Sequence, residues 1–376
     1  MSIRREWQSF DYILLLLICG FTVFGIFMIG AAASYTSLKD VISSYTNQKL
    51  YFVTGLFILT IFTIVDYHFI ARFYWHIYIF MIFLLVLVMI LGKNDSTHTA
   101  RWIRFGGLNI QPSEFSKIFM IVFLAKFIDK QQDTINNIGV LIILGALITM
   151  PVVLIMKQPA LSSCLVVATI GACMIFSSDL KLRYILIATL VVIPIICIFF
   201  WDLQNEERVV LNEVLGVYQM KRIDTFLNPD PDSEEFYQTT MSLTSLGSGM
   251  LEGKGYQNGS YIPMGNNDFI FSTIGEQFGF IGCASVLIVI FIIIGKCISI
   301  ANRAQDKLGR LIAMGVAGKL AFEVYVNVSV ATDILPNTGM PFPFLSAGGS
   351  SLWVNMASIG LVLNIGLFKA KSIFKG

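Results

Sequence analysis

Residues 12–33 read YILLLLICGFTVFGIFMIGAAA, a run without a charged side chain. A helix needs about 20 mostly apolar residues to cross the hydrocarbon core of a bilayer, and this run has that length. It follows a short head, MSIRREW, is too long for the apolar core of a signal peptide and lacks a clear cleavage site. We therefore expect residues 12–33 to form a retained membrane helix.

Similar runs recur along the chain, which is 56% hydrophobic and only 13% charged, about half the charged fraction usual in soluble domains. Continuous apolar runs indicate helices, because the strands of a membrane barrel would alternate. The further predicted spans are 50–65, 70–92, 114–127, 138–156, 160–177, 184–201, 269–296, 310–331 and 350–368. The sequence thus predicts an all-α, polytopic membrane protein of about ten transmembrane helices, with residues 1–376 as one domain.

Lysine and arginine in the short loops predict the orientation. With ten spans, the basic residues near both termini and in alternate short loops fall on one side, which we expect to be the cytoplasm. The segment 202–268 falls on the opposite side and carries eleven acidic against four basic residues. We therefore expect both termini in the cytoplasm and 202–268 as one large extracytoplasmic loop.

Several classes of function are disfavoured. The cysteines lie in or at the ends of apolar spans without metal-type spacing, which favours small core residues over disulfides or ligands. The three histidines are scattered, so sequence neighbours build neither a zinc site nor a histidine-based triad. A phosphate-binding glycine loop is absent, which argues against an ATP-driven pump. We expect no metal-ligand set and no nucleic-acid partner.

Charge is concentrated in RWIRFGGLNIQPSEFSKI, residues 101–118. Arg101 and Arg104 lie on the predicted outer side among apolar residues, and such a partly buried guanidinium pair suits a phosphate or a carboxylate. Glu114 and Lys117 share one face at the proline-marked start of a helix. They form either a buried ion pair between helices or part of a substrate site, and the sequence favours neither.

The long loop contains two distinct stretches. Residues 208–227, RVVLNEVLGVYQMKRIDTFL, are amphipathic, so we expect a helix along the membrane surface. Residues 247–269, GSGMLEGKGYQNGSYIPMGNNDF, are rich in glycine, which suits the wall of a groove. Loops of this length are usually functional or disordered.

Asp268 stands where the loop enters the span 269–296. It either caps that helix or is a carboxylate held on an apolar floor. Burial on such a floor raises the pKa of a carboxyl group and suits general-base chemistry. Glu276, eight residues further on, either joins a polar network or pairs with Lys296 or another base.

Residues 331–353, ATDILPNTGMPFPFLSAGGSSLW, join the last two predicted spans and contain three prolines. Irregular backbone at membrane depth is tolerated only where it is buried in protein or lines a cavity. The connection therefore either holds a lipid or substrate or forms a structural plug.

The signatures of the SEDS proteins (shape, elongation, division and sporulation) resemble, in order and spacing, four stretches of this chain: RWIRFGGLNIQPSEFSKI, GSGMLEGKG, NNDFIFSTIGEQFG and LPNTGMPFPFLSAGGSS. The resemblance covers the chain from the first span to the last. It implies a peptidoglycan glycosyltransferase of the bacterial cytoplasmic membrane that polymerises lipid II on the outer face. Its implied partners are a class B penicillin-binding protein, other elongation or division complex proteins and membrane lipids.

The resemblance also implies roles for residues. The family's essential acid corresponds to Asp268, its acid and base pair to Glu114 and Lys117, and two of its arginines to Arg101 and Arg222. The expected substrate-binding residues are Arg101, Arg104, Glu114, Lys117, Arg222 and Glu276.

The implied reaction is a direct displacement that inverts the anomeric centre of the donor sugar. Asp268 takes the proton of the acceptor hydroxyl group as a general base. Arg101, Arg104 and Lys117, or a divalent cation such as Mg²⁺ or Mn²⁺, stabilise the departing pyrophosphate. The short termini and the glycine-rich loop favour an elongation or a sporulation member.

Several positions depart from the family pattern, among them Ser162, where a glycine is expected, and the stretch NNDF, where HTDF is expected. Ala160 stands where an aspartate is expected, Met241 where a glutamine is expected, and Ala347 where a tyrosine is expected. These departures keep open a catalytically reduced scaffold that activates a partner synthase. A lipid II flippase or transporter is the other alternative, since many spans with charges at membrane depth would serve it too.

Overall fold

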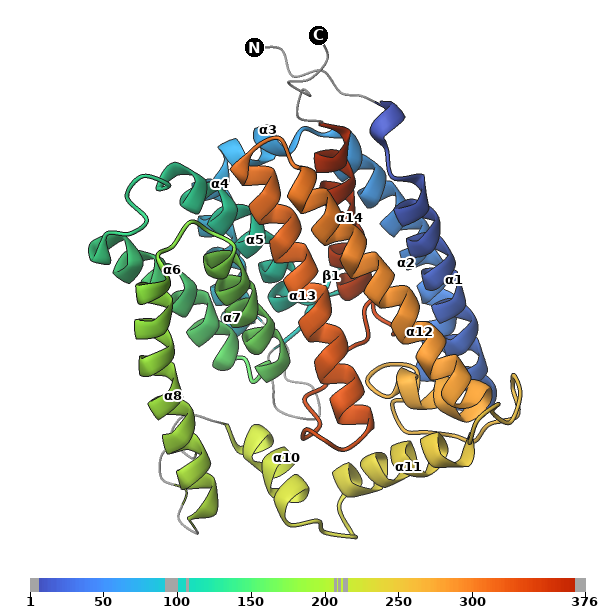
Figure 1. The fold of residues 1–376 in the computed structure, drawn as a ribbon. Coiled ribbons are helices and arrows are strands. Elements are labelled where there is room, and N and C mark those ends of the chain that lie inside the picture. Colours follow the sequence, from blue (N-terminus) through green and yellow to red (C-terminus); the bar gives the residue numbers. More distant parts are fainter. Residues whose placement is uncertain are drawn as a thin grey trace.

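The computed structural model describes residues 7–91, 101–105, 108–205, 208, 211 and 216–368. They form a helical bundle (Figure 1). A short 3-10 helix, η1, covers Trp7–Ser9, and the helices that follow are α1 (Tyr12–Ser34), α2 (Lys39–Ile64), α3 (Tyr67–Arg72), α4 (Tyr74–Leu91), α5 (Pro112–Lys130), α6 (Ile138–Met156), α7 (Leu161–Phe176), α8 (Leu182–Gln204), α10 (Val217–Leu227), α11 (Glu234–Ser248), α12 (Ile270–Arg303), α13 (Lys307–Ala331) and α14 (Gly349–Leu367).

Seven helices in the described part of the chain are long and apolar enough to cross a membrane: α1, α2, α4, α6, α12, α13 and α14. α5 and α7 pack within the same bundle, and α8 lies at its edge (Figure 1). The architecture agrees with the predicted all-α membrane protein of about ten spans. One small element is an addition to that prediction: β1 (Ile103–Phe105) and β2 (Leu108–Ile110) pair as an antiparallel hairpin.

Several helix boundaries differ from the predicted spans. α2 begins at Lys39 rather than at residue 50, because apolarity marks only the part of a helix that meets the bilayer. Gln48, in the polar part of α2, is buried and holds the connection before α14. Its Nε2 donates to the carbonyl of Ser346 (3.3 Å), and its Oε1 accepts from the amide of Gly348 (3.0 Å).

The predicted span 70–92 is in fact two helices, α3 and α4, which meet at Phe73. The amphipathic stretch 208–227 is helical over α10, and residues 206–207, 209–210 and 212–215 lie outside the described part of the chain.

The centre of the bundle is formed by α5, α13 and α14. α13 packs against α5, α7, α12 and α14, and α14 also packs against α2. The outer helices expose large apolar side chains, such as Ile142 on α6 and Phe57 on α2, as expected for contact with lipid. Polar groups in the middle of the three central helices, such as Lys117, Lys319 and Asn355, are therefore shielded from both water and lipid.

The two ends of the bundle differ. The first turn of α1 and the last turn of α14 lie at one end, while α10 and α11 lie at the other (Figure 1). We call the second of these the loop end.

α12 is kinked at Gly279, whose backbone is not helical (φ 62°, ψ −160°). Two amides of the run 250–255 donate to carbonyls just before the kink, at 2.9 and 3.0 Å, and two amides just after it donate back to carbonyls of the run, at 2.9 and 3.2 Å. A Cβ atom on Gly253 (φ +83°) would lie only 2.3 Å from the carbonyl oxygen of Gln277. The glycine-rich run thus packs backbone to backbone and supplies the hydrogen bonds that the kink removes.

Candidate active site

Asp268 lies two residues before α12 begins. Its backbone carbonyl accepts a hydrogen bond from Nδ2 of Asn327 on α13 (2.8 Å), and the same Nδ2 donates to the carbonyl of Met340 (2.7 Å). The side-chain amide of Asn327 therefore binds both the turn before α12 and the connection after α13. The N-cap of α12 is Phe269 and no side chain caps it, so the helix-cap interpretation of Asp268 is wrong.

Two arginines act on the Asp268 carboxyl group from other segments: Arg222 from α10 and Arg101 from the residues before β1. A Cβ atom on Gly339 would lie 3.3 Å from Arg222 Nη1 and 3.5 Å from Asp268 Oδ2, so the guanidinium and the carboxyl group flank the same point. Burial raises the pKa of the Asp268 carboxyl group above its ordinary value, and the positive charges of Arg222 and Arg101 oppose part of that rise.

Each guanidinium group is also held by a main-chain carbonyl. Arg222 Nη1 donates to the carbonyl of Asn337 (2.9 Å), and Arg101 Nε donates to the carbonyl of Gln158 (3.2 Å). Asn337 belongs to the connection 331–353, where Gly339 adopts φ +70°, a conformation that glycine takes without strain. The irregular connection therefore builds one wall of the site, which favours the substrate-side interpretation over a plug.

Open space borders the arginines. A cavity of about 130 Å³ between α10, α11 and the connection is lined by residues that include Arg222, Thr239 and Asn337. A smaller cavity beside it is lined by both Arg101 and Arg222. Two fixed guanidinium groups next to a cavity suit a phosphate group, because each can donate several charge-assisted hydrogen bonds.

Glu114 and Lys117 lie inside the bundle rather than in this cavity. Lys117 Nζ is 2.6 Å from Glu114 Oε1 and 2.9 Å from Glu323 Oε1 on α13. The Lys117 side chain is wholly buried, and Ser163 Oγ on α7 donates to Glu114 Oε1 (3.2 Å). Of the two interpretations left open by the sequence, the geometry favours the ion pair that joins helices.

Sequence reasoning missed Lys319, Glu323 and Asn327, which all lie on α13 within the predicted span 310–331. A signal was available, because Lys319 and Glu323 are opposite charges four residues apart inside an apolar run, where ionisable residues are rare. Their contact with Lys117 could not be read from either helix alone.

Glu276 holds the glycine-rich loop against α12. Its carboxyl group is buried, lies 2.6 Å from Lys254 Nζ and accepts hydrogen bonds from Ser260 Oγ (2.6 Å) and from the Ser260 amide (3.0 Å). The suggested partner Lys296 is wrong, because twenty residues of helix separate the two by about 30 Å. Lys296 instead pairs with Asp11 at the start of α1 (3.0 Å).

The remaining predicted positions are distributed around the site. Arg104 lies in β1, and its side chain is outside the described residues. Ala160 is the buried N-cap of α7, and Met241 lies on α11. The amide of Ala347 donates to the carbonyl of Asn266 (2.8 Å), which places this departure beside the turn that carries Asp268.

In the described part of the chain, no group of three or more histidine, cysteine, aspartate or glutamate side chains is placed to hold a metal ion. Two guanidinium groups, those of Arg222 and Arg101, supply positive charge near the Asp268 carboxyl group.

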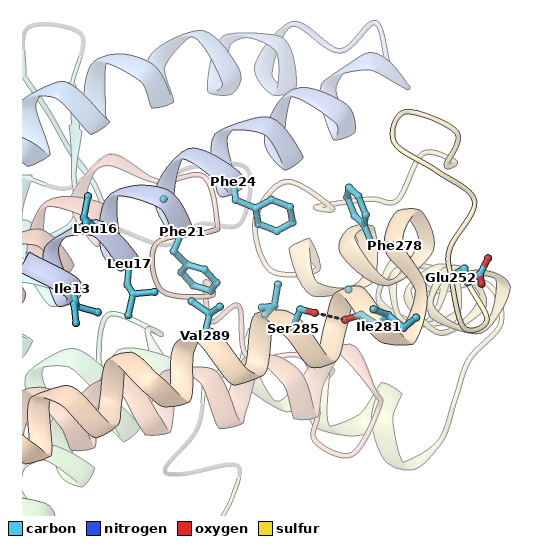
Figure 2. A pocket seen from close by; sticks show the side chains of 13 residues that line it. Ile13, Leu16, Leu17, Phe21, Phe24, Glu252, Phe278, Ile281, Ser285 and Val289 are labelled. Carbon is cyan, nitrogen blue, oxygen red and sulfur yellow. Dashed lines mark hydrogen bonds between the residues drawn. The ribbon is translucent and has the colours of Figure 1, made fainter.

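A large apolar groove of about 900 Å³ runs between α1 and α12 (Figure 2). Its walls include Phe21 and Phe24 on α1 and Phe278 and Val289 on α12, and the acidic residue Glu252 lies at one end. The hydroxyl group of Ser285 in the wall donates to a carbonyl of its own helix (2.7 Å). An apolar lining of this kind suits a hydrocarbon chain from the bilayer.

Comparison with known proteins gives consistent matches along the chain. The model of the FtsW, RodA and SpoVE family, described as "Cell cycle protein", matches residues 11–371. A probable peptidoglycan glycosyltransferase FtsW of Trichlorobacter lovleyi is 34% identical over 95% of this chain and 93% of its own length. Stage V sporulation protein E of Bacillus subtilis is 32% identical over 94% and 96%. Peptidoglycan glycosyltransferase MrdB of Escherichia coli K12 is 34% identical over 77% and 76%.

Solved structures share the fold. A chain from a peptidoglycan synthase complex that coordinates polymerization and crosslinking superimposes with a TM-score of 0.79 at 24% identity, over 96% of this chain and 98% of that chain. The rod shape determining protein RodA of Thermus thermophilus superimposes with a TM-score of 0.69 at 23% identity, over 97% and 99%.

Proposed function

The chain belongs to the FtsW, RodA and SpoVE family, the SEDS proteins, and from this we propose that it is a peptidoglycan glycosyltransferase that polymerises lipid II. The observation that carries the proposal is the meeting of Asp268, Arg101 and Arg222 beside a cavity at the loop end of a membrane bundle. A base beside two phosphate-binding side chains matches the needs of a donor sugar carried on a pyrophosphate.

In the proposed reaction, Asp268 acts as the base, and Arg101 and Arg222 stabilise the leaving group. The acceptor hydroxyl group gives its proton to the Asp268 carboxylate while its oxygen attacks the anomeric carbon of the donor sugar. The bond from that carbon to the pyrophosphate oxygen breaks, and the electron pair leaves with the polyprenyl pyrophosphate. Arg101 and Arg222 stabilise the leaving group's charge, and direct displacement inverts the anomeric centre.

The apolar groove between α1 and α12 supports a substrate that stays in the membrane. It offers about 900 Å³ with an almost entirely apolar lining (Figure 2). We assign it to the polyprenyl chain of a lipid-linked sugar, while the sugar and the pyrophosphate lie at the loop end.

The protein works at the bacterial cytoplasmic membrane with the loop end outside, an orientation supported by the basic residues at the other end of the bundle. A class B penicillin-binding protein is the proposed partner, together with other elongation or division complex proteins. A similar fold within a complex that couples polymerization to crosslinking supports this pairing. Relatives include proteins named FtsW, MrdB and stage V sporulation protein E, so we propose a role in cell division, elongation or sporulation.

The test is a lipid II polymerisation assay with detergent-purified protein, alone and with its partner synthase. Asp268→Asn keeps the shape of the side chain but removes the base, so the rate is expected to fall by at least about 100-fold. Asp232→Asn is the matched control, since it removes an exposed acid from the same outer segment. Polymerisation by the Asp268→Asn protein at the wild-type rate would contradict the proposal.

The same preparation distinguishes the alternatives. If the protein is reconstituted in liposomes, and labelled lipid II crosses the membrane without forming polymer, the result would point to a flippase. Polymer that rises sharply on Ala160→Asp with Met241→Gln would point to a catalytically reduced scaffold, because both changes restore residues that the family pattern expects.

A further inference from the structure

A chain of buried charges runs through the centre of the bundle, where α5, α13 and α14 meet. It begins with the Glu114–Lys117 pair and continues to Glu323, whose Oε1 faces Lys117 and whose Oε2 lies 3.1 Å from Lys319 Nζ. Lys319 Nζ also donates to Oδ1 of Asn355 on α14. We call these five residues the charge chain.

Every member of the charge chain is almost completely buried, from 0% exposure for Lys117 to 5% for Glu114. Moving an ion out of water costs several kcal/mol, and a paired set of buried ions is often no more stabilising than apolar side chains of similar size. Two acids and two lysines balance in charge and alternate along the chain. What such a set adds over an apolar core is one defined arrangement of the helices that carry it.

One helical turn connects the charge chain to the candidate active site. Glu323 and Asn327 are four residues apart on α13, so they lie on the same face, about one turn from each other. Glu323 joins α13 to α5 through Lys117, and Asn327 holds the carbonyl of Asp268. The height and rotation of α13 therefore set the position of the backbone that carries the base.

A second connection runs through α14. Asn355 Nδ2 donates to Ser351 Oγ (3.5 Å) in the first turn of that helix. The neighbouring Ser350 Oγ accepts from the amide of Gln111 (3.1 Å) and donates to the carbonyl of Asn109 (3.3 Å), at the end of β2. The start of α14 thus anchors the hairpin that follows Arg101.

We propose that Glu323 and Lys319 are positioning residues for glycosyl transfer. Through α13 and α14, they hold Asp268 and Arg101 in their positions relative to each other. The proposal rests on the proposed function, since it names residues that serve the same site. Neither residue contacts the substrate. Misplacing a reacting group by about 1 Å can cost about 100-fold in rate, which is why a remote but rigid support affects the chemistry.

The test is the double variant Lys319→Met with Glu323→Gln. It removes one positive and one negative charge and leaves Glu114 and Lys117 as a balanced pair, so no uncompensated charge stays buried. We expect kcat for lipid II polymerisation to fall by about 10- to 100-fold with KM near the wild-type value. Amide hydrogen exchange of residues 262–269 should also become faster, because the turn before α12 loses its support.

Two comparisons sharpen the result. The control variant Asp11→Asn with Lys296→Met removes an ion pair (3.0 Å) at the opposite end of α12, and neither readout should move. Adding Asn327→Ala to the double variant should cost little beyond Asn327→Ala alone, because both changes break the same connection.

Each outcome of these experiments either supports or overturns the proposal. A folded double variant with wild-type kcat and wild-type exchange over 262–269 overturns the proposal. If the double variant does not fold, Asn355→Leu takes its place with the same expected direction, because it removes the contacts of Asn355 with Lys319 and Ser351 and keeps all four charges. A wild-type protein that forms no polymer overturns the proposed function instead, and the exchange measurement alone then decides whether the charge chain supports the Asp268 turn.

Discussion

The Asp268 carboxyl group is subject to opposing influences. Burial disfavours its charged form and raises its pKa, whereas Arg222 and Arg101 favour the charged form and lower it, with burial the larger effect. A general base acts in its deprotonated form, so activity is lost as the pH falls through this pKa. Because the pKa is raised, that loss begins at a higher pH than for an ordinary aspartate.

Arg222→Met is therefore expected to change both the rate and its pH dependence. It removes a cation that stabilises the leaving pyrophosphate, so kcat/KM should fall by about 100-fold. It also removes a charge that lowers the pKa of Asp268, so the acid limb of kcat/KM against pH should move to higher pH. The check is a pH profile of lipid II polymerisation for both proteins.

Lys221→Met is the matched control for Arg222→Met, since it removes the neighbouring positive charge on α10, whose side chain is exposed and paired with Glu235 (3.0 Å). If the acid limb of the Arg222→Met protein lies at the same pH as that of the wild type, Arg222 does not influence the pKa of the base.

At the level of residues, the sequence identified Asp268 and Arg101, because charges beside apolar spans are rare and each is a functional candidate. It could not show that these residues meet, since the contact depends on how the hairpin, α10 and the connection after α13 fold together. The sequence also identifies Glu114 and Lys117, but the choice between an ion pair and a substrate role depends on Glu323, which shares Lys117 from another helix.

Helices were predictable as elements because apolar runs of sufficient length have few alternatives in a bilayer. Their ends and breaks were not, since these depend on local contacts. The kink of α12 is an example: NNDFIFSTIGEQFGFIG reads as a continuous helix start, and only the neighbouring run 250–255 explains how the freed backbone groups at Gly279 are satisfied.

Gly253→Ala tests this account of the kink. The new Cβ atom would lie 2.3 Å from a carbonyl oxygen, at φ +83°, where residues other than glycine are strained. We expect loss of stability of more than about 1 kcal/mol, measured as a lower thermal unfolding midpoint in detergent. Gly247→Ala on α11 is the control, because its Cβ atom would meet nothing within 4 Å and should be neutral or slightly stabilising. Equal midpoints for the two variants would contradict the account.

For the whole molecule, the composition and the length of the apolar runs predicted a multi-pass helical bundle, and the resemblance extended over nearly the entire chain. The different roles of the outer and the central helices were not predictable. Outer helices meet lipid, central helices carry a balanced set of charges, and the site is assembled at one end from segments far apart in the sequence. The apolar groove between α1 and α12 is the place that we propose for the lipid chain of a membrane-borne substrate.

Gly20→Phe tests this assignment of the groove. Gly20 lines the groove, and a Cβ atom there would meet nothing within 4 Å, so the ring can fill the groove without disturbing the backbone. We expect KM for lipid II to rise several-fold with kcat little changed, because ground-state and transition-state binding of the chain are lost equally. A lipid II analogue with a short prenyl chain should be affected less. Gly295→Phe on the exposed face of α12, also with nothing within 4 Å of its Cβ atom, adds the same ring outside the groove and should leave both substrates unchanged. If the two variants behave alike, the polyprenyl chain lies elsewhere on the bundle.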